Sequence, residues 1–175
     1  MSKSYKELMN DIKAFIFDID GVLTDGTVHI AEDGQLLRQM NIKDGYAMKV
    51  AIDKGYPVCI ISGGSNKGVR IRLQNLGIKD IYMATPDKVE KFHEICDAYQ
   101  LKPEEILYMG DDIPDYLVMQ KVGLPTCPQD AVQEIKGISK YISHANGGKG
   151  AVRDVIEQVL KVQGKWMDDF DAKFF

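Results

Sequence analysis

Cysteine is scarce in this chain. Three of the 175 residues are cysteines, and no two of them have the C-x-x-C spacing of metal-binding or redox motifs. One of them, Cys59, lies within an apolar run, where a small buried side chain is the expected role. An odd number of scattered thiols does not form the disulfide framework of small secreted proteins. We therefore expect a cytoplasmic protein that folds around a hydrophobic core.

Long apolar runs and an excess of basic residues are missing too. No run is long enough to span a bilayer, and residues 1–5 lack the apolar stretch of a signal peptide. The formal net charge of −4 is opposite in sign to the basic surfaces that bind nucleic acid. We expect neither a membrane nor a nucleic acid as a partner. The length of 175 residues predicts a single domain, with a core over about residues 12–163 and a tail over 164–175.

Apolar runs and turn residues predict strands that alternate with helices. Asp33-Gly34 between two extended runs predicts a hairpin over about residues 27–42. The alternation is typical of an α/β fold, a Rossmann-like and mostly parallel sheet with helices on both faces. The expected strands cover 14–17, 58–61, 81–83, 106–109, 125–127 and 141–142. The expected helices cover 46–54, 66–76, 87–99, 114–122, 131–136 and 151–162, with Asp44 as the cap of the first.

Polar residues follow four of these strands. Asp18 and Asp20 come directly after the first strand, and Ser62 comes after the second. Lys88 follows the third strand, and Asp111 follows the fourth. Ligand sites in open α/β sheets lie beyond the carboxyl ends of the strands, so we expect these side chains in one site. Asp18 and Asp20 are two residues apart on an extended segment, which places both on the same side of the chain.

This set of residues predicts phosphoryl transfer with a divalent metal. Asp18 would attack a phosphoryl group and form an aspartyl phosphate, while Asp20 would protonate the leaving oxygen and later activate water. The carboxylates of Asp18 and Asp111 and the main-chain carbonyl of Asp20 would bind Mg²⁺, which prefers such oxygen ligands. Charge neutralisation and placement are what the reaction needs. The groups expected to bind the phosphoryl oxygens are Ser62, Gly63 and Lys88.

Each of these features has a simpler interpretation when it stands alone. An isolated Asp-x-Asp is usually solvated or structural, and Ser62-Gly63-Gly64 could be an ordinary turn. Lys88 could be a solvated helix residue, and Gly110-Asp111-Asp112 could begin a helix whose acids favour its amino-terminal dipole. Their coincidence at four successive strand ends favours the functional interpretation.

In order and spacing these residues resemble the motifs of the haloacid dehalogenase superfamily of phosphohydrolases. The motifs stand here as Asp18-Ile-Asp20-Gly21, Ser62, Lys88 and Gly110-Asp111-Asp112-Ile113-Pro114-Asp115. The resemblance covers about residues 12–160 and implies that Asp112 and Asp115 support the metal site or Lys88 from outside the metal's own ligands.

A closer resemblance is to the 3-deoxy-D-manno-octulosonate 8-phosphate phosphatases, which act in lipopolysaccharide sugar synthesis. It rests on residues 18–26, 41–46 and 147–153. The resemblance implies that the substrate is 3-deoxy-D-manno-octulosonate 8-phosphate. It also implies a homotetramer without a cap domain, in which segments of a neighbouring subunit close the site. The spacing agrees with the cap-less part, because neither the interval from Asp20 to Ser62 nor that from Ser62 to Lys88 has room for a second domain.

The sugar contacts and the exact sugar are left open by the sequence. Many family members carry Arg directly after the Ser/Thr-Gly of the second motif, where this chain has Gly64. Related phosphatases of nine-carbon, sialic-acid-type sugar 9-phosphates share much of the pattern. An aromatic tail with Trp166, Phe170, Phe174 and Phe175 either docks on another subunit or frays. The residues that could meet the sugar are Asn41, Lys43, Asp44, Lys67, Arg70, Lys149 and Arg153.

Functions of other classes fit less well. A phospho-aspartate receiver module also uses acids, Ser/Thr and Lys on such a sheet, but its nucleophile follows the third strand, where this chain has no lone Asp. A silent scaffold would not need all four motifs. A phosphoryl-transfer ATPase of the superfamily usually has Thr in place of Asp20. Hydrolysis of a phosphate monoester is therefore the favoured activity.

Overall fold

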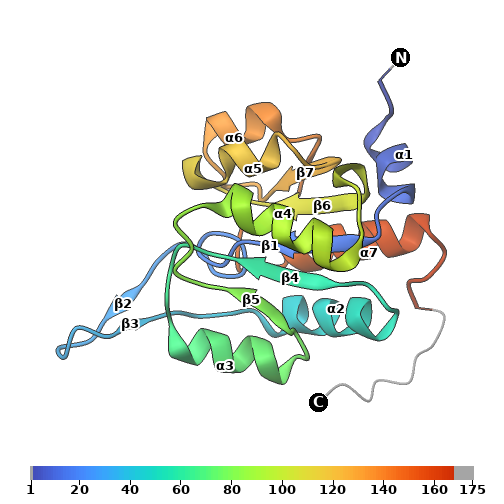
Figure 1. The fold of residues 1–175 in the computed structure, drawn as a ribbon. Coiled ribbons are helices and arrows are strands. Elements are labelled where there is room, and N and C mark those ends of the chain that lie inside the picture. The colour runs from blue at the N-terminus through green and yellow to red at the C-terminus, as the bar shows by residue number, and fades with distance from the viewer. Residues whose placement is uncertain (1, 168–175) are drawn as a thin grey trace.

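A six-stranded parallel sheet organises the chain in the computed structural model, which describes residues 2–167 (Figure 1). Its strands lie in the order β5-β4-β1-β6-β7-β8, and all five pairings are parallel. Their bounds are β1 (Ala14–Phe17), β4 (Val58–Ile61), β5 (Asp80–Tyr82), β6 (Ile106–Met109), β7 (Leu124–Cys127) and β8 (Tyr141–Ile142). This confirms the predicted α/β architecture.

Helices cover both faces of this sheet (Figure 1). Helices α1, α2, α3 and α7 contribute to the core on one face, and α4, α5 and α6 to the core on the other. Among residues 2–167 no helix is long and apolar enough to cross a membrane. The bounds are α1 (Tyr5–Asn10), α2 (Ile42–Asp53), α3 (Lys67–Asn75), α4 (Lys88–Tyr99), α5 (Tyr116–Met119), α6 (Gln133–Ile138) and α7 (Ala151–Val162), with 3₁₀ turns η1 (Pro103–Glu105) and η2 (Ile113–Asp115).

Strand β1 lies at the centre of the sheet and is buried on both faces. Phe15 and Phe17 pack into the core beneath α2 and α7, whereas Ala14 and Ile16 pack into the core beneath α4 and α5. All four are completely buried. Burial of each large apolar side chain contributes about 1.5–3 kcal/mol, so the position of the strand is strongly determined. The residue that follows it, Asp18, therefore starts from a rigid support.

A hairpin extends from the body of the molecule between β1 and α2 (Figure 1). Its strands, β2 (His29–Ile30) and β3 (Leu36–Leu37), pair antiparallel and are shorter than expected. Gly34 has a φ of +85° at the tip, as a tight turn requires. Apolar side chains on this hairpin are open to solvent, with Ile30 76% and Leu37 51% exposed.

Three helix assignments differ from the sequence-based expectation. Helix α2 begins at Ile42 rather than near residue 46, because the Asn41 side chain accepts a hydrogen bond from the Lys43 amide and caps it. Helix α1 was not expected; its cap is Ser4, which forms a capping box with Glu7. The predicted helix over 114–122 is a 3₁₀ turn followed by the single-turn α5.

Asp44, expected as the cap of α2, instead caps a different helix. It lies inside α2, is 1% exposed, and its Oδ1 accepts a hydrogen bond of 2.9 Å from the Arg153 amide in the first turn of α7. The residue before α7, Gly150, has no side chain that could make this bond. Burial raises the pKa of Asp44 to about 6. Asp44 therefore joins α2 to α7, and this burial removes it from the expected sugar contacts.

The chain after α7 folds back on the same body. Trp166 packs against the core, and the Arg153 guanidinium lies 5.5 Å from the centre of its ring. This placement is a cation–π contact within the chain. The other aromatic residues of the expected tail, Phe170, Phe174 and Phe175, lie outside the described residues.

The α2–α7 contact can be tested with Asp44→Ala. Loss of the acceptor leaves an amide of the first turn of α7 unpaired, so we expect unfolding in urea to show a loss of about 1 kcal/mol. The matched control is Asp53→Ala, which removes an exposed acid of the same helix paired with Lys49 at 3.4 Å. Such a pair contributes less than about 0.5 kcal/mol. Equal losses in the two variants would contradict the capping role.

Candidate active site

The carboxyl ends of the central strands surround a cavity of about 410 Å³. It receives side chains from the loops after β1, β4, β5 and β6, because parallel strands end at the same edge of the sheet. The predicted catalytic, metal-binding and phosphate-binding residues all line it. They are Asp18, Asp20, Ser62, Gly63, Lys88, Asp111, Asp112 and Asp115.

Asp18 is held at the end of β1 by the sheet itself. Its amide donates to the Met109 carbonyl of β6 at 3.2 Å, and its Oδ1 accepts from the Ile19 amide at 2.7 Å. The residue is 8% exposed. Its second oxygen, Oδ2, lies 2.9 Å from the Lys88 ammonium. The carboxylate is therefore fixed in orientation, as a nucleophile requires.

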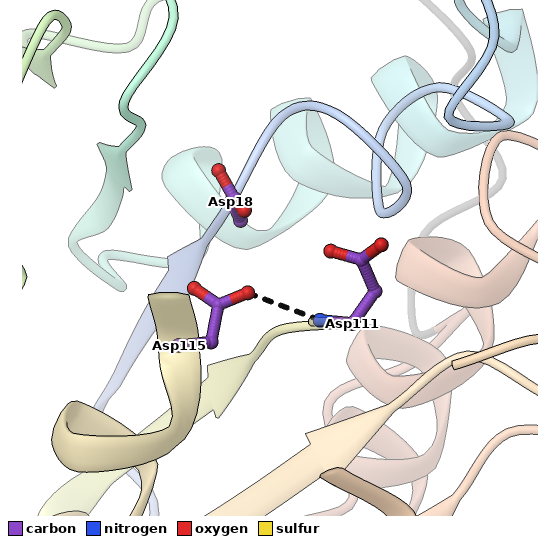
Figure 2. A group of neighbouring side chains, drawn as sticks. All are labelled: Asp18, Asp111 and Asp115. Atoms are coloured by element: carbon purple, nitrogen blue, oxygen red, sulfur yellow. Dashed lines mark hydrogen bonds between the residues drawn. The ribbon is translucent and has the colours of Figure 1, made fainter. Parts of the chain in front are cut away.

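Two further carboxylates, those of Asp111 and Asp115, lie beside it (Figure 2). Asp18, Asp111 and Asp115 each offer an oxygen, and these atoms all lie within 4.8 Å of one another. Gly21 makes room for the group: its φ is +82°, and a Cβ there would lie 1.9 Å from Asp111 Oδ2. A residue with a side chain at position 21 would displace Asp111, which explains the glycine of the first motif.

Asp115 organises this cluster from behind. It is completely buried, and its Oδ1 accepts hydrogen bonds from Lys88 at 2.7 Å and from the Tyr108 hydroxyl at 2.6 Å. Its Oδ2 accepts from the Asp111 amide at 3.1 Å, the bond drawn in Figure 2. Through these bonds Asp115 positions Lys88 and Asp111.

The charges of the cluster do not balance. Three carboxylates and the single ammonium of Lys88 leave two negative charges without a partner. Burial, followed by repulsion from Asp115, raises the pKa of Asp18 to about 7 although Lys88 opposes the shift. Burial and the neighbouring Asp18 raise the pKa of Asp111 to about 8. Burial also disfavours the charge of Lys88, but Asp18 and Asp115 outweigh this and raise its pKa.

This donor set fits a divalent metal. The surplus of two negative charges equals the charge of one such ion, and buried carboxylates this close repel one another unless protons or a cation neutralise them. All the available ligand atoms are oxygens, which Mg²⁺ prefers. Asp18 and Asp111 are the residues that would hold it, and a further ligand from the main-chain carbonyl of Asp20 stays a prediction.

The loop after β4 lies on the other side of the cavity. Ser62 is 2% exposed, and its amide donates to the Tyr82 carbonyl of β5 at 2.8 Å. Its hydroxyl accepts from the Gly64 amide at 3.2 Å. A Cβ at Gly63 would meet nothing within 4 Å, so its backbone borders open space. Ser62, Gly63 and Lys88 thus line the same cavity, where they can donate hydrogen bonds to a phosphoryl group.

Asp20 stands apart from the carboxylate cluster. Its side chain is 42% exposed, and both its oxygens are bound by Arg38, at 2.6 Å to Nε and 3.2 Å to Nη2. Arg38 follows the hairpin and was not identified from the sequence. No spacing rule links position 38 to position 20, since the hairpin between them brings the two together only in the folded chain. The contact of Tyr108 with Asp115 was not predicted either, because the sequence around Tyr108 indicates only a buried strand.

The candidate sugar contacts fall into separate places. Lys67 and Arg70 line a second cavity of about 300 Å³. It adjoins the first, because Ser65 and Ala84 in its lining are the chain neighbours of Gly64 and Thr85 in the lining of the first. Asn41 and Lys149 line a smaller cavity of about 80 Å³. Lys43 is exposed at the start of α2, and Asp44 is buried between helices. Arg153 lies over the rings of Tyr46 and Trp166.

Comparisons with known proteins agree with this geometry. A family model of haloacid dehalogenase-like hydrolases matches residues 41–123. The 3-deoxy-D-manno-octulosonate 8-phosphate phosphatase of Salmonella typhi is 37% identical over 155 residues, which cover 89% of this chain and 82% of that protein.

Solved structures give the same result. The crystal structure of the phosphatase of that name from Yersinia pestis superposes with a TM-score of 0.91 at 33% identity, covering 94% of this chain and 89% of that one. The 3-deoxy-D-manno-octulosonate 8-phosphate phosphatase from Moraxella catarrhalis superposes with a TM-score of 0.88 at 29% identity, covering 91% of this chain and 92% of that one. That crystal structure contains a magnesium ion, a phosphate ion and a 3-deoxy-D-manno-octulosonate (KDO) molecule.

The charge surplus predicts a pH-dependent effect of Mg²⁺ on stability. The pKa values of Asp18 and Asp111 rise from 3.8 to about 7 and about 8 in the folded protein. Between about pH 4 and pH 8 the folded state retains protons on these two carboxyl groups that the unfolded chain has lost. The metal-free protein therefore becomes less stable as the pH rises through this range. Mg²⁺ takes the place of these protons, and we expect its effect on the melting temperature to be larger at about pH 8.5 than at about pH 5.

The measurement is a melting curve in chelator and in excess Mg²⁺ at both pH values. Asp111→Asn removes one carboxylate of the cluster and should reduce both the pH dependence and the Mg²⁺ effect. The control is Asp97→Asn, which changes an exposed acid on α4 in the same way. A Mg²⁺ effect of equal size at both pH values would show that these carboxylates do not bind the ion.

Proposed function

The chain belongs to the 3-deoxy-D-manno-octulosonate 8-phosphate phosphatase family of haloacid dehalogenase-like hydrolases, and we propose that it hydrolyses that sugar phosphate through a phosphorylated Asp18. The protein is a phosphatase. The observation that carries the proposed mechanism is the placement of Asp18: a buried, rigidly held carboxylate between Lys88 and a second carboxylate, Asp111, at the floor of the cavity.

In the first step Asp18 attacks phosphorus. A bond forms between a carboxylate oxygen of Asp18 and the phosphorus atom, while the bond from phosphorus to the sugar oxygen breaks. Asp20 gives its proton to that oxygen, and the sugar leaves as an alcohol. Ser62, the Gly63 amide and Lys88 bind the phosphoryl oxygens and neutralise their charge.

In the second step Asp20 acts as a base. It takes a proton from water, whose oxygen attacks phosphorus, and the bond to Asp18 breaks. Inorganic phosphate leaves, Asp18 is a carboxylate again, and Asp20 holds a proton for the next turnover. Asp18 and Asp111 would hold Mg²⁺, which would supply positive charge that screens the nucleophile from the phosphate oxygens. Lys88, held by Asp115, lowers the same repulsion through its own positive charge.

Lys67 and Arg70 are proposed to bind the carboxylate of the sugar. Both line the 300 Å³ cavity that adjoins the catalytic one, so a substrate with phosphate in the first cavity extends into the second. An arginine is well suited to bind a carboxylate through two parallel hydrogen bonds. These residues would replace the anchor that other family members have at the position of Gly64.

We further propose a cytoplasmic homotetramer. No cap domain covers the catalytic cavity within residues 2–167, and Asp20 at its mouth is 42% exposed. The hairpin presents exposed apolar residues, Ile30, Leu36 and Leu37 among them, which are suited to contacts between copies of the chain. A neighbouring subunit would then exclude water from the reaction.

The roles of the two acids can be separated by mutation. Asp18→Asn removes the nucleophile, so we expect no detectable turnover. Asp20→Asn removes the proton donor and base, so we expect turnover to fall about 10²–10⁴-fold while Asp18 still accepts phosphate. The measurements are phosphate release and covalent phosphate on the denatured protein. The control Asp33→Asn changes an acid at the hairpin tip; normal turnover of Asp18→Asn would refute the nucleophile assignment.

The substrate can be identified by a phosphate-release screen with Mg²⁺. We expect 3-deoxy-D-manno-octulosonate 8-phosphate to give a higher kcat/KM than a nine-carbon keto-deoxy sugar 9-phosphate, phosphoserine or hexose phosphates. Lys67→Ala and Arg70→Ala should raise KM for the keto-acid substrates but not for hexose phosphates, which have no carboxylate. A preference for the nine-carbon substrate would identify the related phosphatase instead, and a preference for hexose phosphates would overturn the proposed substrate class.

A further inference from the structure

The hairpin is connected to the active site through one ion pair. Arg38, directly after β3, binds Asp20 in a fork: Nε lies 2.6 Å from Oδ1, and Nη2 lies 3.2 Å from Oδ2. Two parallel hydrogen bonds from a planar guanidinium determine both the direction and the rotation of a carboxylate. A lysine at this position could offer only a point charge.

Arg38 is itself held in place by the folded chain. Its Nη1 donates to the Leu36 carbonyl at 3.2 Å, and the same carbonyl accepts from Asn66 Nδ2 at 2.9 Å. Asn66 is anchored because its Oδ1 caps α3 by accepting from the Val69 amide at 2.9 Å. The Arg38 side chain is only 11% exposed. The guanidinium is therefore clamped between the hairpin and the start of α3, with the edge formed by Nε and Nη2 turned toward Asp20.

The ion pair borders the loop that lines the phosphate side of the cavity. A Cβ on Gly64 would lie 3.3 Å from Asp20 Oδ2 and 3.8 Å from Arg38 Nη2. Oδ2 is thus the oxygen of Asp20 that faces this loop. Each oxygen of a carboxyl group has two lone pairs, so Oδ2 can bind Arg38 with one and carry a proton on the other.

We propose that Arg38 is a positioning residue that orients Asp20 for its two proton transfers. Asp18 is fixed by the sheet and by buried partners, whereas the Asp20 side chain is 42% exposed and is bound on both oxygens by Arg38. An unrestrained Asp side chain samples several rotamers, and a proton transfer requires hydrogen-bond reach to the reacting oxygen. This inference rests on the proposed function, because it assigns Arg38 to the acid and base of that reaction.

The test compares two phosphate esters in the step that phosphorylates Asp18. With an alkyl ester such as the sugar phosphate, the leaving oxygen needs a proton; with p-nitrophenyl phosphate, the phenolate leaves without one. We expect Arg38→Ala to slow phosphoenzyme formation from the alkyl ester about 10–100-fold, because a misoriented Asp20 loses part of the roughly 10²–10⁴-fold that general acid catalysis contributes. The burst of nitrophenolate should change little. Arg38→Lys should retain charge but not the fork, and should be slowed for the alkyl ester as well.

A double-mutant cycle makes the assignment specific. When Asp20 is already Asn, Arg38→Ala should cause no further loss with either ester, since residues that act through one another are not additive. Gln35→Ala, another substitution on the hairpin and outside the lining of the catalytic cavity, is the matched control and should leave both rates unchanged. Circular dichroism and melting curves establish whether each variant is folded. If Arg38→Ala does not fold, Arg38→Lys takes its place in the comparison.

Two results would overturn the proposal. Equal slowing with both esters would mean that Arg38 contacts the substrate or only holds the hairpin, and a further loss in the Asp20→Asn background would show that it acts independently of Asp20. A failure of the proposed function looks different, because the wild-type protein would then release phosphate from neither ester.

Discussion

An imbalance of charge at the carboxyl ends of β1 and β6 is the constraint on which the rest of the site depends. Asp18, Asp111 and Asp115 lie within reach of one another, and Lys88 offers one positive charge against their three negative ones. A buried cluster of this kind is stable only with protons or a cation. The same imbalance that opposes folding at high pH creates the site for a divalent metal.

The two acids of the first motif occupy contrasting environments. Asp18 extends a strand that is buried on both faces, so its position follows from the core of the protein. Asp20, two residues later, is partly exposed and is bound by Arg38 from the hairpin. A nucleophile benefits from rigidity, whereas an acid that acts on the leaving group needs contact with the region where substrates arrive. Through Arg38 the hairpin is thus linked to an acid that lines the cavity.

Much of the fold and most of the site residues could be predicted from the sequence. Strands such as 14–17 and 106–109 are short apolar runs followed by acids, and parallel strands must end at one edge. Two helix starts were missed because of local caps at Ser4 and Asn41, and other predictions failed where the partner lies far away in the chain. Asp44 reads as a helix cap, yet it is buried and accepts a hydrogen bond from the Arg153 amide, 109 positions later. Arg38 and Tyr108 carry no motif, so their contacts with Asp20 and Asp115 were not foreseen.

The sequence alone determined the chemistry and the architecture, because strand periodicity and the order of the four motifs depend on neighbouring residues. Only the tertiary structure decided how the charges are shared: that Asp115 holds Lys88 and the Asp111 amide, and that Arg38 holds Asp20. Hydrogen bonds and ion pairs act over a few ångströms in space. Which groups come that close depends on how the hairpin and helices pack, and local sequence patterns do not contain that information.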